Sequence, residues 1–333
     1  MNALRSAYEA LYRWMLAGGG DPTDEVLVLS HVRPDGDSLG AQTAIHHLLT
    51  VLGRPAAMAN ADPPPKRFDY LPAFHAILPP EAFSERLERH GRFRRAIFVD
   101  CADRERIGAA EALLDPEAEI VNIDHHATND GYGHINVVRP DASSTSEVVY
   151  DFVRAVGLPL DQDLATALYT GILTDTGGFR YQNTSPKVLH DAAELVERGA
   201  EPYFIAEHAL ETMSLSQVRL LARALSDIRL VLGGRVALVE VTEALLRETD
   251  ADLDASEGLV HYARNIEGVE VAVLLREQSD GIKVSFRSRR TVDVAALARQ
   301  FGGGGHVRAA GALLPPPLSA AREAVIRALE AVL

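Results

Sequence analysis

The sequence predicts an α/β protein with two domains: a parallel-sheet N-terminal domain with helices on both faces, and a smaller α/β C-terminal domain reached through a helical linker. Three observations predict this. Short apolar runs alternate with helix-compatible segments in the first part, a mostly helical region extends from residue 144 to about 226, and paired strands with tight turns follow. Buried parallel strands form continuous apolar runs, whereas antiparallel strands come in pairs. A chain of 333 residues also exceeds the usual size of one core.

The first part of the chain contains the expected parallel strands. Val26–Ser30 (VLVLS) is typical of a buried strand, and Leu39–Leu52 has helical periodicity that ends at Gly53. Ala96–Asp100 and Glu119–Asp124 are further apolar runs that end in an aspartate. We expect this domain to cover residues 1–212, followed by a linker helix over 213–226.

The second domain is expected over residues 227–333. Gly233 and Gly234 separate two apolar runs and predict a hairpin. The other expected elements are helices near Leu245 and Leu259, strands at Val269–Arg276 and Ile282–Ser288, a helix at Val294–Gln300 and a terminal helix.

Composition excludes several classes of protein. The net charge is −14, of which −12 lies before residue 227, so a protein that coats long duplex nucleic acid is not expected. A short anionic substrate needs only a local basic pocket. The one cysteine, Cys101, excludes a disulfide framework and a thiolate zinc site. No apolar run predicts a membrane span, the N-terminal segment is unlike a signal peptide, and we expect a cytoplasmic protein.

Eight aspartate and histidine residues stand at the ends of apolar runs. Because parallel strands end at the same sheet edge, these side chains are expected to meet there. Aspartate and histidine are ligands of hard and borderline divalent metals, so the pattern predicts a two-metal site. The residues are His31, Asp35, Asp37, Asp100, Asp124, His125, His126 and Asp175.

Each segment also has a simpler interpretation. Pro34 and Gly36 shape a turn that could direct Asp35 and Asp37 to two cations, but aspartate at a turn is also a common helix cap. Asp100 and Asp175 could likewise be caps, and a single buried histidine is more often a core residue than a ligand. Four such coincidences are less probable than one shared site.

The second domain carries candidate substrate-binding residues. Arg287 and Arg289 are alternate residues at the end of a predicted strand, so they are expected on one face and could bind phosphate. Arg290 is expected to point elsewhere as a solvated charge. The run from Gly302 to Gly305 could leave backbone N–H groups open to a phosphate, with His306 beside it, or could be only a flexible loop. In the first domain, Arg106 and the pair Ser144–Thr145 are weaker candidates, with surface charge and helix cap as alternatives.

Taken in order, these motifs resemble the DHH phosphoesterase family. HxxPDGDSLG, the strand-end Asp100, the Asp124-His125-His126 triplet and TDTGGF correspond to its metal motifs. Phe286–Arg289 (FRSR) and Gly302–Gly311 (GGGGHxxAAG) are similar to the DHH-associated nucleotide-binding domain. The resemblance spans nearly the whole chain.

The resemblance implies a role for each motif residue. One cation is expected on His31, Asp35 and Asp100. A second is expected on Asp37, Asp100, His125 and Asp175, with Asp100 shared. Asp124 would orient an imidazole and His126 would face the scissile phosphate. Two divalent cations are expected, Mn²⁺ first and Mg²⁺ or Co²⁺ as alternatives. The expected substrate contacts are Arg106, Arg287, Ser288, Gly303, Gly304, Gly305 and His306.

The activity that the resemblance implies is hydrolysis of short single-stranded oligoribonucleotides to nucleoside 5′-monophosphates. A nucleotide bisphosphate, 3′-phosphoadenosine-5′-phosphate, would be converted to AMP and phosphate. Alternatives are a phosphodiesterase for cyclic or linear dinucleotides, an inorganic pyrophosphatase, and a non-catalytic module that binds RNA ends. A homodimer through Ser144–Arg154 is a further expectation; long duplexes and membranes are not expected partners.

Overall fold

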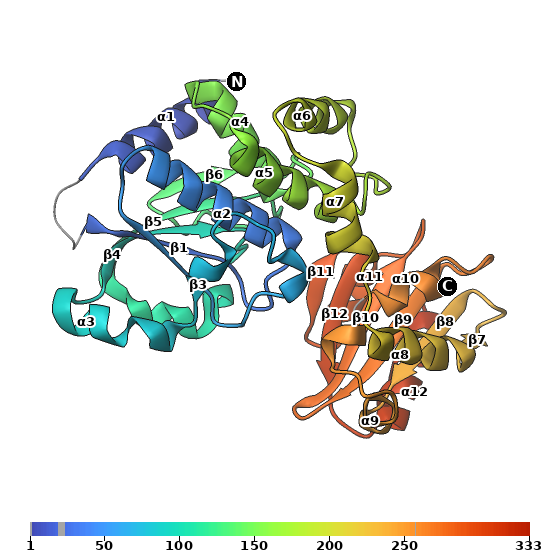
Figure 1. Cartoon of the computed structure of the whole chain (residues 1–333). Coiled ribbons are helices and arrows are strands. Elements are labelled where there is room, and N and C mark those ends of the chain that lie inside the picture. The colour runs from blue at the N-terminus through green and yellow to red at the C-terminus, as the bar shows by residue number, and fades with distance from the viewer. Residues whose placement is uncertain (1, 19–23, 257) are drawn as a thin grey trace. The chain divides into compact units, whose positions relative to one another are not determined.

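A computed structural model describes residues 2–18, 24–256 and 258–333 (Figure 1). The chain forms two compact units that divide between Thr212 and Met213. We call residues up to 212 the first unit and residues from 213 the second unit.

The first unit contains a six-stranded sheet of order β3-β2-β1-β4-β5-β6, in which all neighbouring strands are parallel. The prediction of a parallel sheet is confirmed. The order reverses between β1 and β4, so their carboxyl ends form the place where ligands bind in open α/β sheets. The strands are β1 (Val26–Leu29), β2 (Ala56–Ala59), β3 (Ile77–Leu78), β4 (Phe93–Val99), β5 (Leu114–Asp124) and β6 (Ile135–Val138).

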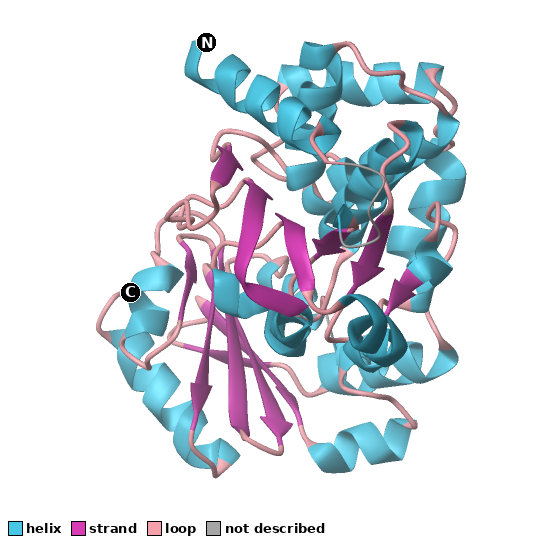
Figure 2. Cartoon of the chain, turned by 90° about the vertical axis from the view of Figure 1, so that its left-hand side faces the viewer, coloured by secondary structure: helices cyan, strands magenta, loops and turns pink. Residues whose placement is uncertain are grey.

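Alternate residues of β1 serve two cores, one on each sheet face. Val26 and Val28 pack with the long helices, whereas Leu27 and Leu29 join the core that includes Ile107. Figure 2 shows the strands in magenta with the helices around them. The α-helices are α1 (Asn2–Leu16), α2 (Gly36–Val51), α3 (Ser84–His90), α4 (Thr145–Val156), α5 (Gln162–Asp175), α6 (Pro186–Glu197) and α7 (Pro202–Ala206); the short helical turns are η2 (Lys66–Phe68), η3 (Phe74–Ala76), η4 (Pro80–Phe83), η5 (Arg104–Leu113) and η6 (Glu207–Glu211).

The helix considered for a dimer interface is α4. Its apolar side chains Val148, Val149, Phe152 and Val153 are buried in the core of the first unit. These four side chains are therefore not exposed on α4, and the homodimer stays a prediction.

The second unit has a mixed sheet of order β11-β12-β10-β9-β8-β7, in which only β8 and β9 are parallel neighbours. The segment expected as a linker forms α8, whose Leu220 and Ala224 are buried with this sheet. Among the described residues, no helix has the length and apolar character to cross a bilayer. The elements are α8 (Leu215–Ser226), β7 (Arg229–Val231), β8 (Val236–Val241), α9 (Glu243–Thr249), η7 (Asp254–Ser256), α10 (Leu259–Arg264), β9 (Val271–Gln278), β10 (Gly281–Ser288), α11 (Val294–Arg299), β11 (Gly304–His306), β12 (Ala309–Leu314) and α12 (Leu318–Glu330).

Candidate metal centre

The carboxyl ends of β1, β4 and β5 bring most of the predicted ligands together. The first turn of α2 and the end of α5 add an aspartate each. Their possible ligand atoms form three groups, each within 4.8 Å. The groups are His31–Asp35–Asp100, Asp37–His125–Asp175 and Asp100–His125–His126. We call these seven residues the Asp–His cluster.

Asp100 lies at the centre of the Asp–His cluster. Its Oδ2 is 3.3 Å from Nε2 of His31, and its Oδ1 is 3.6 Å from both Nε2 of His125 and Nδ1 of His126. Asp100 has a left-handed backbone with φ of +59°, a conformation that concentrates at functional sites. It is not a helix cap, because Asp103 caps η5 by accepting from the N–H of Arg106.

Asp35 caps a helix and also lies beside a histidine of the cluster. It is the N-cap of α2 and accepts from the N–H of Ser38, so the simpler interpretation as a cap is correct for this residue. The same carboxylate oxygen lies 3.8 Å from Nε2 of His31. Gly36 is needed for a different reason from the one expected: a Cβ there would lie 2.5 Å from the side chain of Thr174, so its role is close packing.

Asp37 is buried against the start of α4. Its Oδ2 accepts from the N–H of Thr145 at 2.7 Å and its Oδ1 from the N–H of Ser146 at 2.9 Å. Helix N-termini favour negative charge, so this contact stabilises the carboxylate.

Hydrogen bonds at Nδ1 orient the rings of His31 and His126. Nδ1 of His31 is 2.8 Å from the carbonyl of Val32, which places the proton on Nδ1 and leaves Nε2 toward Asp100. Nδ1 of His126 is 2.8 Å from Asp124, and Asn129 donates to the other oxygen of Asp124 at 2.6 Å. Asp124 is thus placed to orient His126. Asn129 was not identified from the sequence. The signal that could have found it is its position shortly after the Asp124-His125-His126 triplet.

The concentration of negative charge in the cluster shifts the pKa values of its members. Burial and the charge of Asp100 raise the pKa of Asp37 to about 7. Burial lowers the pKa values of His31 and His125, but neighbouring carboxylates, Asp100 above all, outweigh it and raise both to about 9. For Asp100, burial acts to raise the pKa of the carboxyl group. The hydrogen bond and charge of His31 outweigh burial and hold this pKa well below its usual range. A divalent cation would offset this concentration of carboxylates, and the mixed imidazole and carboxylate donors suit one.

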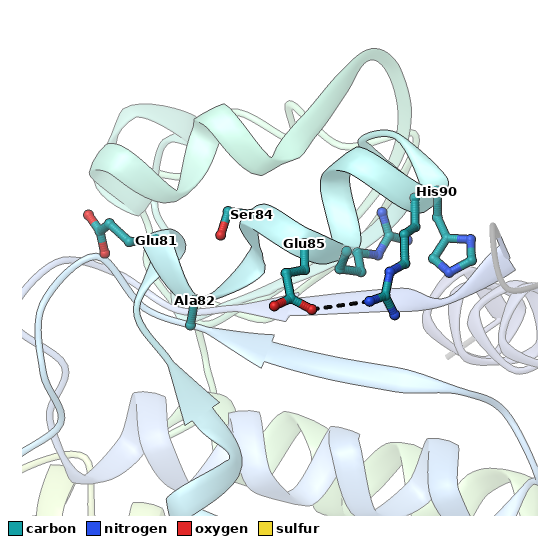
Figure 3. A pocket seen from close by; sticks show the side chains of 7 residues that line it. Glu81, Ala82, Ser84, Glu85 and His90 are labelled. Carbon is teal, nitrogen blue, oxygen red and sulfur yellow. Dashed lines mark hydrogen bonds and ion pairs between the residues drawn. The ribbon is translucent and has the colours of Figure 1, made fainter.

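One surface pocket lies apart from this cluster. A pocket lined by η4 and α3, with an ion pair between Glu85 and Arg89, belongs to the segment that leads into the amino end of β4 (Figure 3).

Arg106 is in η5, where its carbonyl accepts from the N–H of Val32 beside His31. Its charge also opposes protonation of His31, so Arg106 is close to the cluster.

In the second unit, two residues predicted to bind substrate lie in one row across neighbouring strands. Strand register pairs Arg287 of β10 with Ala309 of β12, and Ala309 with His306 of β11. Paired residues share a sheet face, so Arg287 and His306 project to the same side across a small alanine. The glycine run is partly an edge strand and not only a loop, because Gly304 and Gly305 pair with β12.

Two other candidates lie elsewhere. Ser288 is adjacent to Arg287 on the strand and therefore faces the opposite side, where it is buried beside Arg308. Arg289 lies beyond the end of β10, so alternation along the strand does not place it with Arg287. Its N–H donates to the carbonyl of Glu270.

Comparison with known proteins identifies the family. The model described as "DHH family, N-terminal domain" matches residues 25–172, and the model described as "DHHA1 domain" matches residues 233–333. The bifunctional oligoribonuclease and PAP phosphatase NrnA of Thermus thermophilus is 36% identical over 290 residues, covering 87% of this chain and 84% of that protein. The chain belongs to the DHH family.

Further members of the DHH family and its fold are similar over both units. NrnA of Bacillus subtilis is 30% identical over 292 residues, which cover 87% of this chain and 89% of that protein. The crystal structure of an exopolyphosphatase-related protein from Bacteroides fragilis has a TM-score of 0.89 at 26% identity, covering 98% of this chain and 96% of that one. The family resemblance and the α/β fold expected from the sequence are confirmed.

Proposed function

We propose that this protein is a two-metal phosphoesterase that hydrolyses short oligoribonucleotides to nucleoside 5′-monophosphates and 3′-phosphoadenosine-5′-phosphate to AMP and phosphate. The Asp–His cluster at the β1–β4 switch point carries the proposal. The similarity to NrnA over both units supports this choice of substrates. The cytoplasm is the proposed location, because one cysteine cannot form the internal disulfides that are common in oxidising compartments.

The proposed ligands divide into two sets that share Asp100. His31, Asp35 and Asp100 would hold one divalent cation. Asp37, Asp100, His125 and Asp175 would hold a second; Mn²⁺ is the proposed ion, with Mg²⁺ or Co²⁺ as alternatives. Such a pair of cations lowers the pKa of a bound water and offsets charge on the phosphate.

The protein groups then position the phosphate and the nucleotide. Asp124 holds the ring of His126 through Nδ1, which directs Nε2 to a non-bridging phosphate oxygen, where charge develops during hydrolysis. Arg106 is a further proposed phosphate contact. In the second unit, Arg287 would bind a terminal phosphate, His306 would stack on a base or donate to phosphate, and the exposed backbone of Gly304 allows close approach. Gly303 and Gly305 shape the same edge.

A substrate panel tests the proposal. Purified protein with Mn²⁺ is incubated with di- to pentaribonucleotides, 3′-phosphoadenosine-5′-phosphate, cyclic dinucleotides and pyrophosphate. We expect mononucleotides from the first and AMP from the second; no turnover of either would reject the proposal. Turnover of cyclic dinucleotides or pyrophosphate alone would instead support the corresponding alternative.

Replacing the shared ligand tests the site. Asp100→Ala should lower kcat/KM more than about 100-fold, beyond the 10–100-fold typical of groups that only support a ligand. Asp103→Ala removes the same charge three residues away, where the carboxylate only caps η5, and should retain turnover. Substantial activity in Asp100→Ala would contradict the shared position of Asp100.

A further inference from the structure

Thr145 connects two carboxylates of the Asp–His cluster. Its hydroxyl donates to Oδ1 of Asp100 at 2.9 Å, while its backbone N–H donates to Oδ2 of Asp37 at 2.7 Å. Asp37 comes from α2 and Asp100 from the end of β4, so one residue bonds to side chains of two separate elements. Thr145 is fully buried.

The hydroxyl of Thr145 is not required to cap its own helix. Ser144 is the N-cap of α4 and accepts from the N–H of Glu147. Glu147 in turn accepts from the N–H of Ser143 and forms an ion pair with Lys187 of α6. The start of α4 is therefore held by other groups, and the Thr145 side chain is left to serve Asp100.

Close helix packing brings α4 to this position. A Cβ on Gly171 of α5 would lie 1.9 Å from Oγ of Ser146 and 2.6 Å from Oδ1 of Asp37. The glycine thus leaves space for both the start of α4 and the Asp37 carboxylate. The position of Thr145 is consequently set by α2, α4 and α5 together.

The hydrogen bond decides how the Asp100 carboxylate is turned. Oδ1, which accepts from Thr145, faces His125 and His126, whereas Oδ2 faces His31. Rotation of this carboxylate would move Oδ1 away from His125 and His126 and Oδ2 away from His31. We propose that Thr145 is a positioning residue that fixes the two oxygens of Asp100, one toward each proposed cation, and thereby sets the affinity of both. This inference rests on the proposed function.

The test measures Mn²⁺ binding directly, from the electron paramagnetic resonance signal of free Mn²⁺, in addition to turnover. Thr145→Val keeps the shape and the backbone N–H but removes the hydroxyl, and should weaken Mn²⁺ binding about 10–100-fold. Thr145→Ser keeps the hydroxyl and should stay within about threefold of wild type. Turnover of Thr145→Val should recover as Mn²⁺ is raised, which a general structural defect would not show.

Thr43→Val is the matched control. Thr43 is equally buried on α2, and its hydroxyl donates only to carbonyls of its own helix, so the variant should bind Mn²⁺ like wild type. Unchanged binding in Thr145→Val, or a loss in Thr145→Ser as large as in Thr145→Val, would overturn the role of Thr145. If Thr145→Val does not fold, Thr145→Ala is compared with Thr145→Ser by the same criterion. Wild-type protein that binds no Mn²⁺ would instead reject the proposed function.

Discussion

At the scale of single residues, protonation of His31 and His125 opposes cation binding. Neighbouring carboxylates raise both pKa values to about 9, yet an imidazole binds a metal only when neutral. Below pH 9 the metal must therefore displace protons, so Mn²⁺ affinity should increase with pH by up to about tenfold per unit for each proton released. Mn²⁺ titrations between pH 6.5 and 8.5 at constant ionic strength measure this slope.

A histidine outside the cluster provides the control for this slope. His47 pairs with Asp161 on the surface of α2, so His47→Gln should leave the pH dependence unchanged. Affinity that does not vary with pH would show that the cation displaces no protons from the cluster histidines.

The residue types and their placement after apolar runs were sufficient to predict the Asp–His cluster. Thr145 is different, because the sequence shows only a polar pair at a helix start, which favours capping or substrate contact. Its actual partner is Asp100, 45 residues away, and the contact depends on how closely α2, α4 and α5 pack. A side chain that acts through such packing has no local signature.

At the scale of elements, strand alternation explains which predictions in the second unit were accurate. The strand over Ile282–Ser288 was expected, and β10 spans Gly281–Ser288. Alternation then separates Ser288 from Arg287, a distinction that a motif such as FRSR conceals. The edge strand β11 could not be expected, since glycine has low strand propensity and pairs here because β12 is adjacent.

Gly303, just before β11, and Gly304, its first residue, should respond differently to the same change. A Cβ on Gly303 would lie 2.1 Å from the carbonyl of Gly311, so Gly303→Ala should destabilise the unit by about 1–3 kcal/mol. Gly304 has open space at that position, and Gly304→Ala should leave stability unchanged but raise the KM for oligoribonucleotides severalfold. Urea unfolding and steady-state kinetics of both variants provide the comparison.

The outcome for Gly304→Ala decides whether this edge contacts the substrate. Unchanged kinetics on oligoribonucleotides would assign the glycine run a structural role only. A generic phosphodiester that lacks a base serves as the control substrate and should be hydrolysed at the wild-type rate.

At the scale of the whole molecule, the proposed roles divide between the two units. The proposed cation ligands all lie between residues 31 and 175, whereas the Arg287–His306 row belongs to the second unit. Ligands that bind only the folded state stabilise the part that they contact. Hydrogen exchange should therefore show Mn²⁺ protection near residues 99–101, 124–126 and 143–146, and AMP protection near 284–288 and 304–311. EDTA should abolish the first pattern, and Arg287→Ala should reduce the second; AMP protection confined to the first unit would contradict this division.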